Sequence, residues 1–498
     1  MIPVSMQSFS IKQSGWIHRG SFIGGAIMIV GSAISISLVS AGAAVAVLFW
    51  IAEAYQNRNS GGVRWKMPLP FYFGFALFGW LALSLAVRSI LAWFGLWPID
   101  GVPSDGFDAF LWHLRKGWNT ELKDVLLILT GLWTYTHSRD ALSRRWLLRC
   151  FYWAGVTILV TGFISIFTLH RLAKIPYHLL HGWQATAAAR FQHHVGTLFA
   201  STSDPIHLYM PIGLQNTHMT YAALAGLFTL FLVFSLASRY VRRPLRSFLD
   251  RRFLLLALAL VAMGIVLILN NGRSALLAIA LSAVVGLYWF IRNRWKSKAR
   301  ALWFPIGALI AVLVLSAVAL TIADSSAGRM RETAESLTGE EKHTDYQRLL
   351  VWNAAHKMMF AHPLFGVGPG AFSASVERDI IETGESKPFL FYPYALIQRG
   401  HSHNDLFNFA AIGGLPAAAI FLAFWASVLL EVLDAGGRGR LWKFGLLIVF
   451  FGGWFQCFFL DDEVIIPFWC LLGLVIPGKK RMTPEAQLMK TESKGNPE

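Results

Sequence analysis

The side chains best suited to chemistry gather in and just after one polar stretch, residues 323–403, of an otherwise apolar chain. Its end carries His401 and His403, and an imidazole has the ordinary pKa that a general base needs near neutral pH. Asp405 stands close enough in the sequence to orient one of these rings. The same pattern also fits half of a metal site, or histidines that merely lie at a membrane surface. We therefore predict a proton acceptor here, with both alternatives open.

An arginine precedes these histidines, at the start of a predicted helix. Thr344 and Gln347 have the spacing of a capping box, which predicts a helix over about residues 345–361. Arg348 falls in its first turn, where exposed N–H groups and the helix dipole would help the guanidinium to hold a phosphate. Trp352 lies on the apolar stripe of the same helix. An ordinary ion pair explains Arg348 equally well, because three acidic residues are near it in the sequence: Glu340, Glu341 and Asp345.

A glycine-rich turn follows that helix, after His362. Gly366, Gly368 and Gly370 occur at every second position, and glycine permits positive φ and a close approach of the backbone to a ligand. We therefore predict that Gly366 and Gly368 contact the substrate. The turn lacks the Lys-Ser/Thr pair of a nucleotide-binding P-loop. No nucleotide cofactor is expected, so an activated substrate or an ion gradient must supply the energy.

A second arginine stands in a very short turn. Arg273 is the only charge between two apolar segments, and it precedes Ser274, a residue suited to begin a helix. An arginine in such a place is costly unless it meets water or a partner, so a functional role is the first expectation. The start of a helix also favours anions. The alternative is that the Arg273 side chain extends to a lipid phosphate.

Residues 170–216 are rich in histidine and carry two further cations, Arg171 and Arg190. The pair His193-His194 is compatible with a metal site. However, aromatic and aliphatic residues are interleaved with the polar ones, as in segments that lie at the level of lipid head groups. We therefore predict an interfacial segment without a metal ion.

The composition places most of the chain in a lipid bilayer. Hydrophobic residues make up 55% and charged residues 14% of the 498, which is more apolar surface than one soluble core can hide. A membrane-crossing segment must be helical, since hydrocarbon offers no partners to free N–H and C=O groups. The prediction is an all-α polytopic membrane protein whose membrane domain covers residues 1–476. About twelve segments approach the necessary length of about 20 residues: 21–37, 39–54, 70–91, 120–136, 147–169, 217–238, 253–269, 275–291, 301–322, 406–430, 442–460 and 463–476.

Basic residues mark one side of the membrane. Lys and Arg concentrate in every second loop, for example residues 239–252 and 292–300, whereas the longer segments between them mix basic and acidic residues. Because Lys and Arg are retained in the cytoplasm, both termini are predicted to be cytoplasmic, and the polar tail 477–498 to be disordered. The net charge of +16 then reflects contact with anionic lipid, and nucleic-acid binding is not expected.

The order of these motifs is similar to that of the O-antigen ligase and Wzy-type polymerase superfamily. The resemblance implies about twelve helices, with a large periplasmic loop that contains short helices, residues 323–403, before the tenth. It also implies a bacterial inner-membrane protein with its active site on the periplasmic side. The motifs cover about residues 253–420 and occur in this order: Arg273 between two helices, Arg348 to Trp352, the turn at 362–368, Phe372, His403-Asn404 and Gly413-Gly414.

The chemistry that this resemblance implies agrees with the residues. Members move a glycan from undecaprenyl diphosphate to an acceptor hydroxyl with inversion at the anomeric carbon, and the acceptor of a ligase is lipid A-core. Arg273 and Arg348 would hold the diphosphate, and His403, with His401 as the second candidate, would take the acceptor proton. No metal or other cofactor is implied. The other expected substrate contacts are Asn404, Asp405, Trp352, Gly366, Gly368 and Arg190, with Arg171 as the alternative to Arg190.

Other assignments remain open. A polymerase uses the same donor but extends a growing lipid-linked glycan. A related protein O-oligosaccharyltransferase usually carries an extra C-terminal soluble domain, whereas this chain ends soon after its last predicted helix. A polysaccharide or lipid transporter is the alternative of another class. Transporters tend to place ionisable residues at mid-membrane, whereas Arg273, Arg348 and His403 gather at the outer edge. The ligase is the favoured prediction.

Overall fold

The computed structural model describes residues 15–56, 67–96, 105–175, 179, 192–199, 205–242, 250–294, 344–386, 400–434 and 441–476. Within these ranges the chain is helical except for one two-stranded hairpin, which confirms the predicted all-α class for the part described. The predicted span 301–322 and the predicted tail 477–498 lie outside the described residues.

Six of the described helices are long and apolar enough to cross a membrane, and each coincides with a predicted span. Two further apolar helices, α1 (Trp16–Gly31) and α12 (Arg273–Arg294), also coincide with predicted spans. The fold is therefore that of a polytopic membrane protein, while the number twelve stays a prediction. The six long helices are α2 (Ile36–Gln56), α3 (Leu69–Trp93), α7 (Ala141–Ser165), α9 (His218–Arg242), α11 (Arg251–Asn270) and α18 (Asp405–Asp434).

Two predicted spans are interrupted by irregular turns. The segment predicted at 120–136 follows α4 (Gly106–Gly117) and consists of the π-helix Trp118–Leu122, α5 (Lys123–Leu126) and α6 (Ile128–His137). The segment predicted at 442–460 divides into the 3₁₀-helix Leu441–Leu446, α19 (Leu447–Gly452) and the 3₁₀-turn Phe458–Leu460. Local departures from α-helical geometry often mark functional positions. The irregular residues after α19 are among those that position the candidate site.

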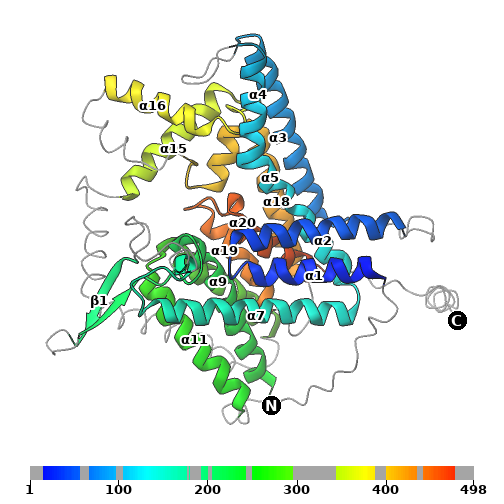
Figure 1. Cartoon of the computed structure of the whole chain (residues 1–498), viewed down its shortest axis with the longest axis vertical. Coiled ribbons are helices and arrows are strands. Elements are labelled where there is room, and N and C mark those ends of the chain that lie inside the picture. The colour runs from blue at the N-terminus through cyan, green and yellow to red at the C-terminus, as the bar shows by residue number, and fades with distance from the viewer. Residues whose placement is uncertain are drawn as a thin grey trace.

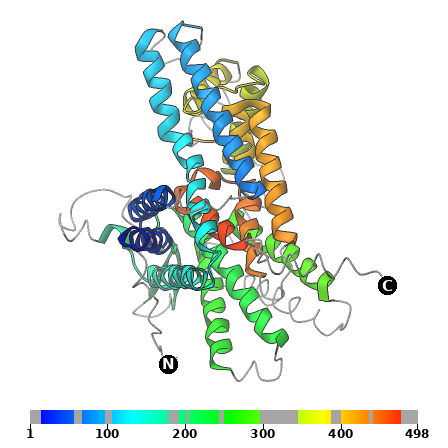
Figure 2. The same ribbon diagram turned by 90° about the vertical axis from the view of Figure 1, so that its right-hand side faces the viewer.

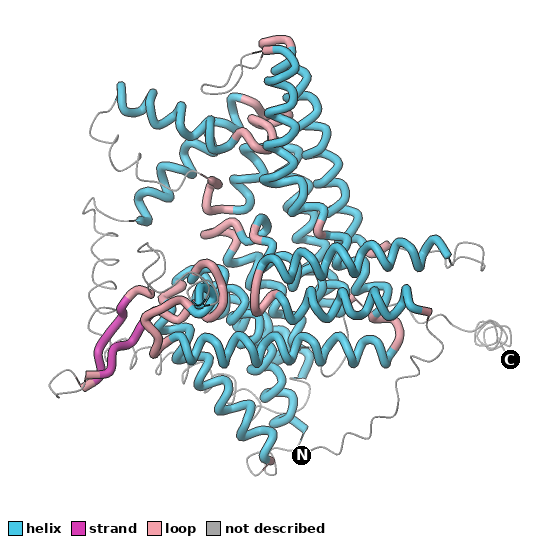
Figure 3. Tube along the Cα trace, in the orientation of Figure 1, coloured by secondary structure: helices cyan, strands magenta, loops and turns pink. Residues whose placement is uncertain are grey.

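The helices form two sets that cross each other. α3, α4 and α18 run along the long axis of the molecule, and α15 (Thr344–Ala361) and α16 (Phe372–Ser386), both from the predicted 323–403 loop, lie beside them (Figure 1). α1, α2 and α7 lie across that axis, and α1 and α2 are seen nearly end-on in Figure 2. The hairpin of β1 (His194–Leu198) and β2 (Ile206–Tyr209) projects from the side of the helical body (Figure 3).

The core is centred on α20 (Asp462–Val475). All of its residues from Glu463 to Val475 are buried except the partly buried Leu471, and a helix that is apolar on every side belongs inside the protein. Trp469 stacks on Phe71 of α3 with ring centroids 6.0 Å apart, and it lies 5.3 Å from Phe424 of α18. Aromatic packing therefore holds α3, α18 and α20 together. It also fixes the segment just before α20 against the start of α18.

The glycine-rich turn inserts into a break in α18. The helix is interrupted at Gly414, where φ is 72°. The N–H of Val367 donates to the carbonyl of Ala411 at 2.8 Å, and the N–H of Gly368 donates to that of Ile412 at 3.1 Å. These carbonyls precede the break and lack their usual partners within the helix. The turn therefore supplies hydrogen-bond donors to the free carbonyls of α18 where that helix is interrupted. It also fixes the position of α15 on α18.

Candidate functional site

His403 lies in a strained loop, residues 400–404, just before α18. Its φ of 52° falls in the left-handed region that few non-glycine residues adopt. Ser402 secures the loop, because its hydroxyl donates to the carbonyl of Asn404 at 2.6 Å and its N–H donates to Oδ1 of Asn408 at 3.1 Å. Strain of this kind persists where surrounding contacts enforce it, and it is frequent at functional sites.

The ring of His403 has a defined partner in Gln456, which belongs to the irregular segment between α19 and α20. Nδ1 of His403 lies 2.7 Å from Oε1 of Gln456. An amide oxygen only accepts hydrogen bonds, so Nδ1 carries the hydrogen and the neutral ring keeps its lone pair on Nε2. The ring of His401 lies beside it, with centroids 4.5 Å apart. Gln456 thus holds His403 in the tautomer that takes a proton through Nε2.

Asn404 caps α18 rather than facing outward. Its Oδ1 accepts the N–H of Phe407 at 3.0 Å, which is the usual geometry of a helix N-cap. Its amide nitrogen donates to the carbonyl of Trp454 at 3.0 Å, and only 2% of the residue is exposed. Asn404 therefore positions the neighbouring histidine through the backbone.

Asp405 has a structural contact in place of the expected one. Its carboxylate accepts the N–H of Phe459 at 3.1 Å, and its own N–H donates to the carbonyl of Gly453 at 2.7 Å. The residue is 2% exposed. The sequence predicted Asp405 as the group that orients His403, but Gln456 makes that contact. Asp405 instead joins α18 to the segment that carries Gln456.

The surroundings keep both histidines of the loop neutral near neutral pH. Burial lowers the pKa of His403 below its ordinary value near 6.5, the contact with Gln456 opposes this, and the positive charge of Arg348 lowers the pKa further. Burial, together with His403, lowers the pKa of His401 to about 3. A neutral imidazole is the form that accepts a proton, so the environment favours a general base.

Arg348 approaches the 400–404 loop from α15. This helix begins at Thr344, as the capping pattern predicted, although the side chains of the capping box lie outside the described residues. Arg348 is therefore the fifth residue of the helix, just after its first turn. One turn further on, the partly exposed ring of Trp352 packs against Phe407 of α18 with centroids 5.8 Å apart. This contact sets α15 on α18 so that Arg348 faces the histidine loop.

The positive charge of Arg348 also acts on a second histidine, His218. His218 begins α9, and the positive charges of Arg348 and Arg171 both act on its ring. Nη1 of Arg171 donates to the carbonyl of Asn216 at 3.4 Å, just before α9. Arg348 thus lies within electrostatic range of both His218 and His403. The tertiary structure thus gathers side chains from segments that are far apart in the sequence into one cluster, which consists of Arg348, Arg171, His218 and His403.

Arg273 lies in a turn that packs against the start of α9. Nδ2 of Asn270 donates to the carbonyl of Pro211 at 2.6 Å, and Gly272 fits against the side chain of Ala222. The side chain of Arg273 is exposed and begins α12, as predicted. The structure therefore places Arg273 at the same end of α9 as this cluster.

Three of these residues, Arg273, Arg348 and His403, also fall within one stretch of the sequence. Residues 258–422 match the family model of O-antigen ligase. About a third of the chain is therefore similar to that family. The predicted resemblance to that superfamily is confirmed over this segment, which extends from α11 into α18. A search among curated proteins gave no match to the chain.

The matched segment, residues 258–422, supplies only part of the cluster. It contains Arg273, Arg348 and His403, whereas Gln456 and His218 lie outside the matched residues. Sequence reasoning did not select Gln456, because it falls in a stretch predicted as an apolar span. A polar side chain within such a span was the signal that would have found it. His218 gave no comparable signal, since a lone histidine beside an apolar segment is usually interfacial.

The glycine-rich turn of the matched segment packs against other parts of the protein. Gly366 and Gly368 are buried, and their N–H groups donate to the carbonyls of His362 at 2.8 Å and Ile412 at 3.1 Å. The carbonyl of Gly366 accepts a hydrogen bond from Arg88 of α3. These backbone groups join the turn to α3 and α18, and the substrate contact of the two glycines stays a prediction.

The third arginine of the cluster is Arg171, the alternative that the sequence offered. Arg190, the first choice, lies outside the described residues. Acidic residues at the start of α20 adjoin the same end of α9: Oγ1 of Thr220 donates to Asp461 at 2.6 Å, and burial raises the pKa of Asp461 to about 6. This hydrogen bond fastens α9 to the residue just before α20.

Proposed function

We propose that this protein is an inverting glycosyltransferase of the O-antigen ligase type. It moves a glycan from undecaprenyl diphosphate to a sugar hydroxyl of lipid A-core on the periplasmic side of the inner membrane. The observation that carries the proposal is the position of Arg348, within electrostatic range of both His403 and His218. The reaction needs a cation where a diphosphate leaves and a neutral base where a hydroxyl loses its proton. The family match over residues 258–422 supports this assignment.

His403 would act as the general base. Its Nε2 takes the proton of the acceptor hydroxyl while the hydroxyl oxygen forms a bond to the anomeric carbon of the donor sugar. The bond between that carbon and the diphosphate oxygen breaks, and undecaprenyl diphosphate leaves with the electron pair. Attack from the side opposite the leaving group inverts the anomeric configuration. The contact of Nδ1 with Gln456 holds the ring in place throughout.

The arginines would stabilise the leaving diphosphate. Negative charge grows on the diphosphate as the glycosidic bond breaks, and cations already held in place stabilise it without a reorganisation cost. Arg348 is the fifth residue of α15 and Arg273 the first residue of α12, so each lies near a helix N-terminus whose dipole also favours an anion. Arg171 is the third cation. Trp352 and His401 remain proposed substrate contacts because both are partly exposed beside the base.

A shallow apolar hollow beside the histidine loop is a candidate contact for the lipid chain of such a donor. It starts at Asn404 and Asp405 and is partly open to the outside. A polyprenyl chain is itself apolar, and its burial there removes hydrocarbon from contact with head groups and water. The hollow is lined by Leu406, Phe421, Leu422, Trp425, Phe450 and Trp454.

Deletion of the gene, followed by electrophoresis of lipopolysaccharide, tests the proposal. Loss of a ligase leaves bare lipid A-core and polymer that stays on undecaprenyl diphosphate. A core that carries a single repeat would indicate a polymerase, and an unchanged ladder would overturn both assignments. The matched complementation pair is His403→Ala, which should fail, and His356→Ala, which removes an exposed imidazole of α15 and should restore the ladder.

A transporter predicts a different outcome in a defined system. Purified protein, a lipid-linked glycan donor and lipid A-core in detergent contain no two compartments, so transport has no meaning there. A transferase should still form the glycan–lipid A-core product. Absence of product from an intact, monodisperse protein would contradict the proposed reaction.

A further inference from the structure

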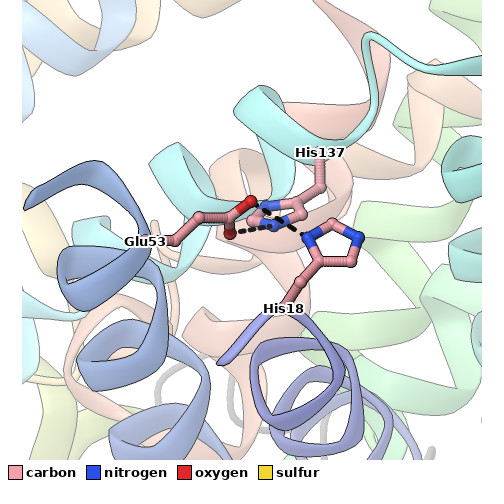
Figure 4. Close-up of side chains that lie close together, drawn as sticks. All are labelled: His18, Glu53 and His137. Atoms are coloured by element: carbon pink, nitrogen blue, oxygen red, sulfur yellow. Dashed lines mark hydrogen bonds and ion pairs between the residues drawn. The ribbon is translucent and has the colours of Figure 1, made fainter. Parts of the chain in front are cut away.

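A second polar cluster lies away from the candidate active site. His18 comes from the first turn of α1, Glu53 from the last turn of α2, and His137 is the last residue of α6 (Figure 4). One nitrogen or oxygen atom from each of these side chains lies within 4.8 Å of the other two. The sequence predicted no metal, because nothing in the spacing of these residues connects them. Only the packing of α1, α2 and α6 brings them together.

The hydrogen bonds of His137 define which nitrogen is free to bind a cation. Its Nδ1 lies 2.9 Å from the carbonyl oxygen of Trp133, which can only accept, so Nδ1 carries the hydrogen. In the neutral ring, the lone pair of Nε2 then faces Oε2 of Glu53 at 3.4 Å. Within the described ranges, no donor makes a hydrogen bond to this buried oxygen. Two electron-pair donors therefore face each other, and a cation between them would remove the repulsion.

The distances in the cluster suit a tetrahedral metal ion. With metal–ligand bonds of about 2.0–2.1 Å, neighbouring ligand atoms of a zinc site lie about 3.3 Å apart. The observed separations are 3.4 Å from His137 to Glu53 and 3.0 Å from Nδ1 of His18 to Oε1 of Glu53. The Nδ1–H bond to a backbone carbonyl is also the usual outer support of a histidine ligand.

The exposure of the side chains leaves access for a further ligand. His18 and Glu53 are 33% and 27% exposed, whereas His137 is 7% exposed. A water molecule can therefore reach a fourth position, while the third residue anchors the site inside the protein. Two imidazoles and one carboxylate form a donor set that favours zinc and its transition-metal neighbours over magnesium or calcium.

We propose that His18, Glu53 and His137 bind one divalent transition-metal ion of the zinc class. The ion joins three helices, and its role is structural, because the reacting groups lie elsewhere. It fastens the open end of the α1–α2 hairpin to α6. The turn of the same hairpin meets the segment before α9, where Nε2 of Gln215 donates to the carbonyl of Ser32 at 2.9 Å. The metal thus holds one end of the α1–α2 hairpin in place, and the other end of the hairpin contacts the segment before α9, close to the candidate site.

Metal binding to the purified full-length protein tests this proposal directly. The protein is prepared in detergent without a histidine tag, stripped with a chelator, and titrated with Zn²⁺ and separately with Co²⁺. The wild-type chain should bind one ion, show the visible absorption of tetrahedral Co²⁺, and gain at least about 2 °C in apparent Tm at saturation. His137→Gln and Glu53→Gln should lose the ion and the Tm gain, and His356→Ala, a matched loss of one exposed imidazole, should keep both.

The opposite results are equally clear. A wild-type chain that binds no ion, or His137→Gln and Glu53→Gln variants that bind as well as wild type, would overturn the site. A simple ion pair between a protonated histidine and Glu53 predicts a lower Tm for His137→Gln but no effect of chelator on wild type, and that pattern would also refute the metal. If His137→Gln does not fold, the isosteric Glu53→Gln decides, because it keeps the shape of the side chain but loses the carboxylate charge.

Discussion

Oε1 of Gln456 lies 2.7 Å from Nδ1 of His403, so a residue outside the matched segment 258–422 fixes the tautomer of a candidate base inside it. The relationship depends on two irregular segments. The histidine loop has a left-handed residue, and the chain between α19 and α20 is not a continuous helix. Because neither segment is regular, the contact could not be read from helical periodicity.

Loss of the Gln456 amide should slow transfer without removing the substrate sites. In Gln456→Leu the ring of His403 can rotate and change tautomer, so kcat should fall by about 10- to 100-fold while KM for the donor changes little. The measurement is product formation by purified protein with a lipid-linked donor. A kcat within about twofold of wild type would show that Gln456 does not position the base.

A carboxylate at position 456 should show whether Gln456 acts by accepting the hydrogen bond from His403 or only by stabilising the fold. Gln456→Glu keeps an acceptor for Nδ1–H, so most of the activity should return relative to Gln456→Leu. The added negative charge favours the imidazolium, which raises the pKa of His403. The acid side of the pH–rate profile should therefore move to higher pH. An unchanged profile would argue against His403 as the titrating base.

Removal of the candidate base or of the shared cation should abolish transfer in an inserted protein. His403→Ala removes the proton acceptor and Arg348→Ala removes charge stabilisation of the leaving group, so each should cost about 100-fold or more in kcat/KM. The check is the glycan ladder on lipopolysaccharide together with the amount of protein in the membrane. Near-normal surface glycan in either variant would refute the assignment.

Arg378→Ala is the matched control for Arg348→Ala. Arg378 lies on the neighbouring helix α16, is exposed, and pairs with Glu382 one turn away at 2.8 Å. Exposed pairs of this kind contribute little to stability. The variant should therefore retain the ladder, and its loss would mean that any change of charge in this region impairs the protein.

A side chain at Gly366 should destabilise the fold rather than weaken substrate binding. Its φ of 60° disfavours alanine by about 1–2 kcal/mol, and a methyl group would also meet the backbone of Ala411 and Ile412. Gly366→Ala should lower the apparent Tm by several degrees and reduce the amount of folded protein. Gly79→Ala on α3, where a methyl group meets no atom within 4 Å, is the control. Equal Tm values for the two variants would contradict the packing role.

Acid should destabilise the protein partly through His113 of α4. The residue is 1% exposed, and burial, assisted by the charge of Arg88, lowers the pKa of its imidazole to about 4 from an ordinary value near 6.5. The unfolded chain therefore takes up this proton first, and stability should fall as the pH drops from 6.5 towards 4. Thermal unfolding at pH 7.5 and 4.5 measures the effect.

His113→Leu removes this component of the pH dependence. The apolar replacement should lose fewer degrees of apparent Tm between the two pH values than wild type, whereas His356→Leu on the exposed face of α15 should lose as many. If His113→Leu shows the full acid loss, the buried imidazole is not a source of it.

Composition and charge already determined the class of the molecule. The long apolar segments had to become helices, because hydrocarbon leaves backbone groups no other partners, and six described helices meet the requirement for a span. The capping pattern at Thr344 located α15, since it depends only on local residues. Arg273, Arg348 and His403 were selected for the same reason: charged or titratable side chains are rare and costly in an apolar chain.

The sequence did not determine which residues from distant segments contact one another in the folded protein. The contact of His403 with Gln456 and the proximity of Arg348 to His218 join segments far apart in the chain. The packing role of Gly366 also depends on a break in another helix. No local pattern encodes such pairs, because they follow from how buried surfaces fit. Sequence alone therefore identified the reactive side chains, and the tertiary structure decided which of them form a site and which only support it.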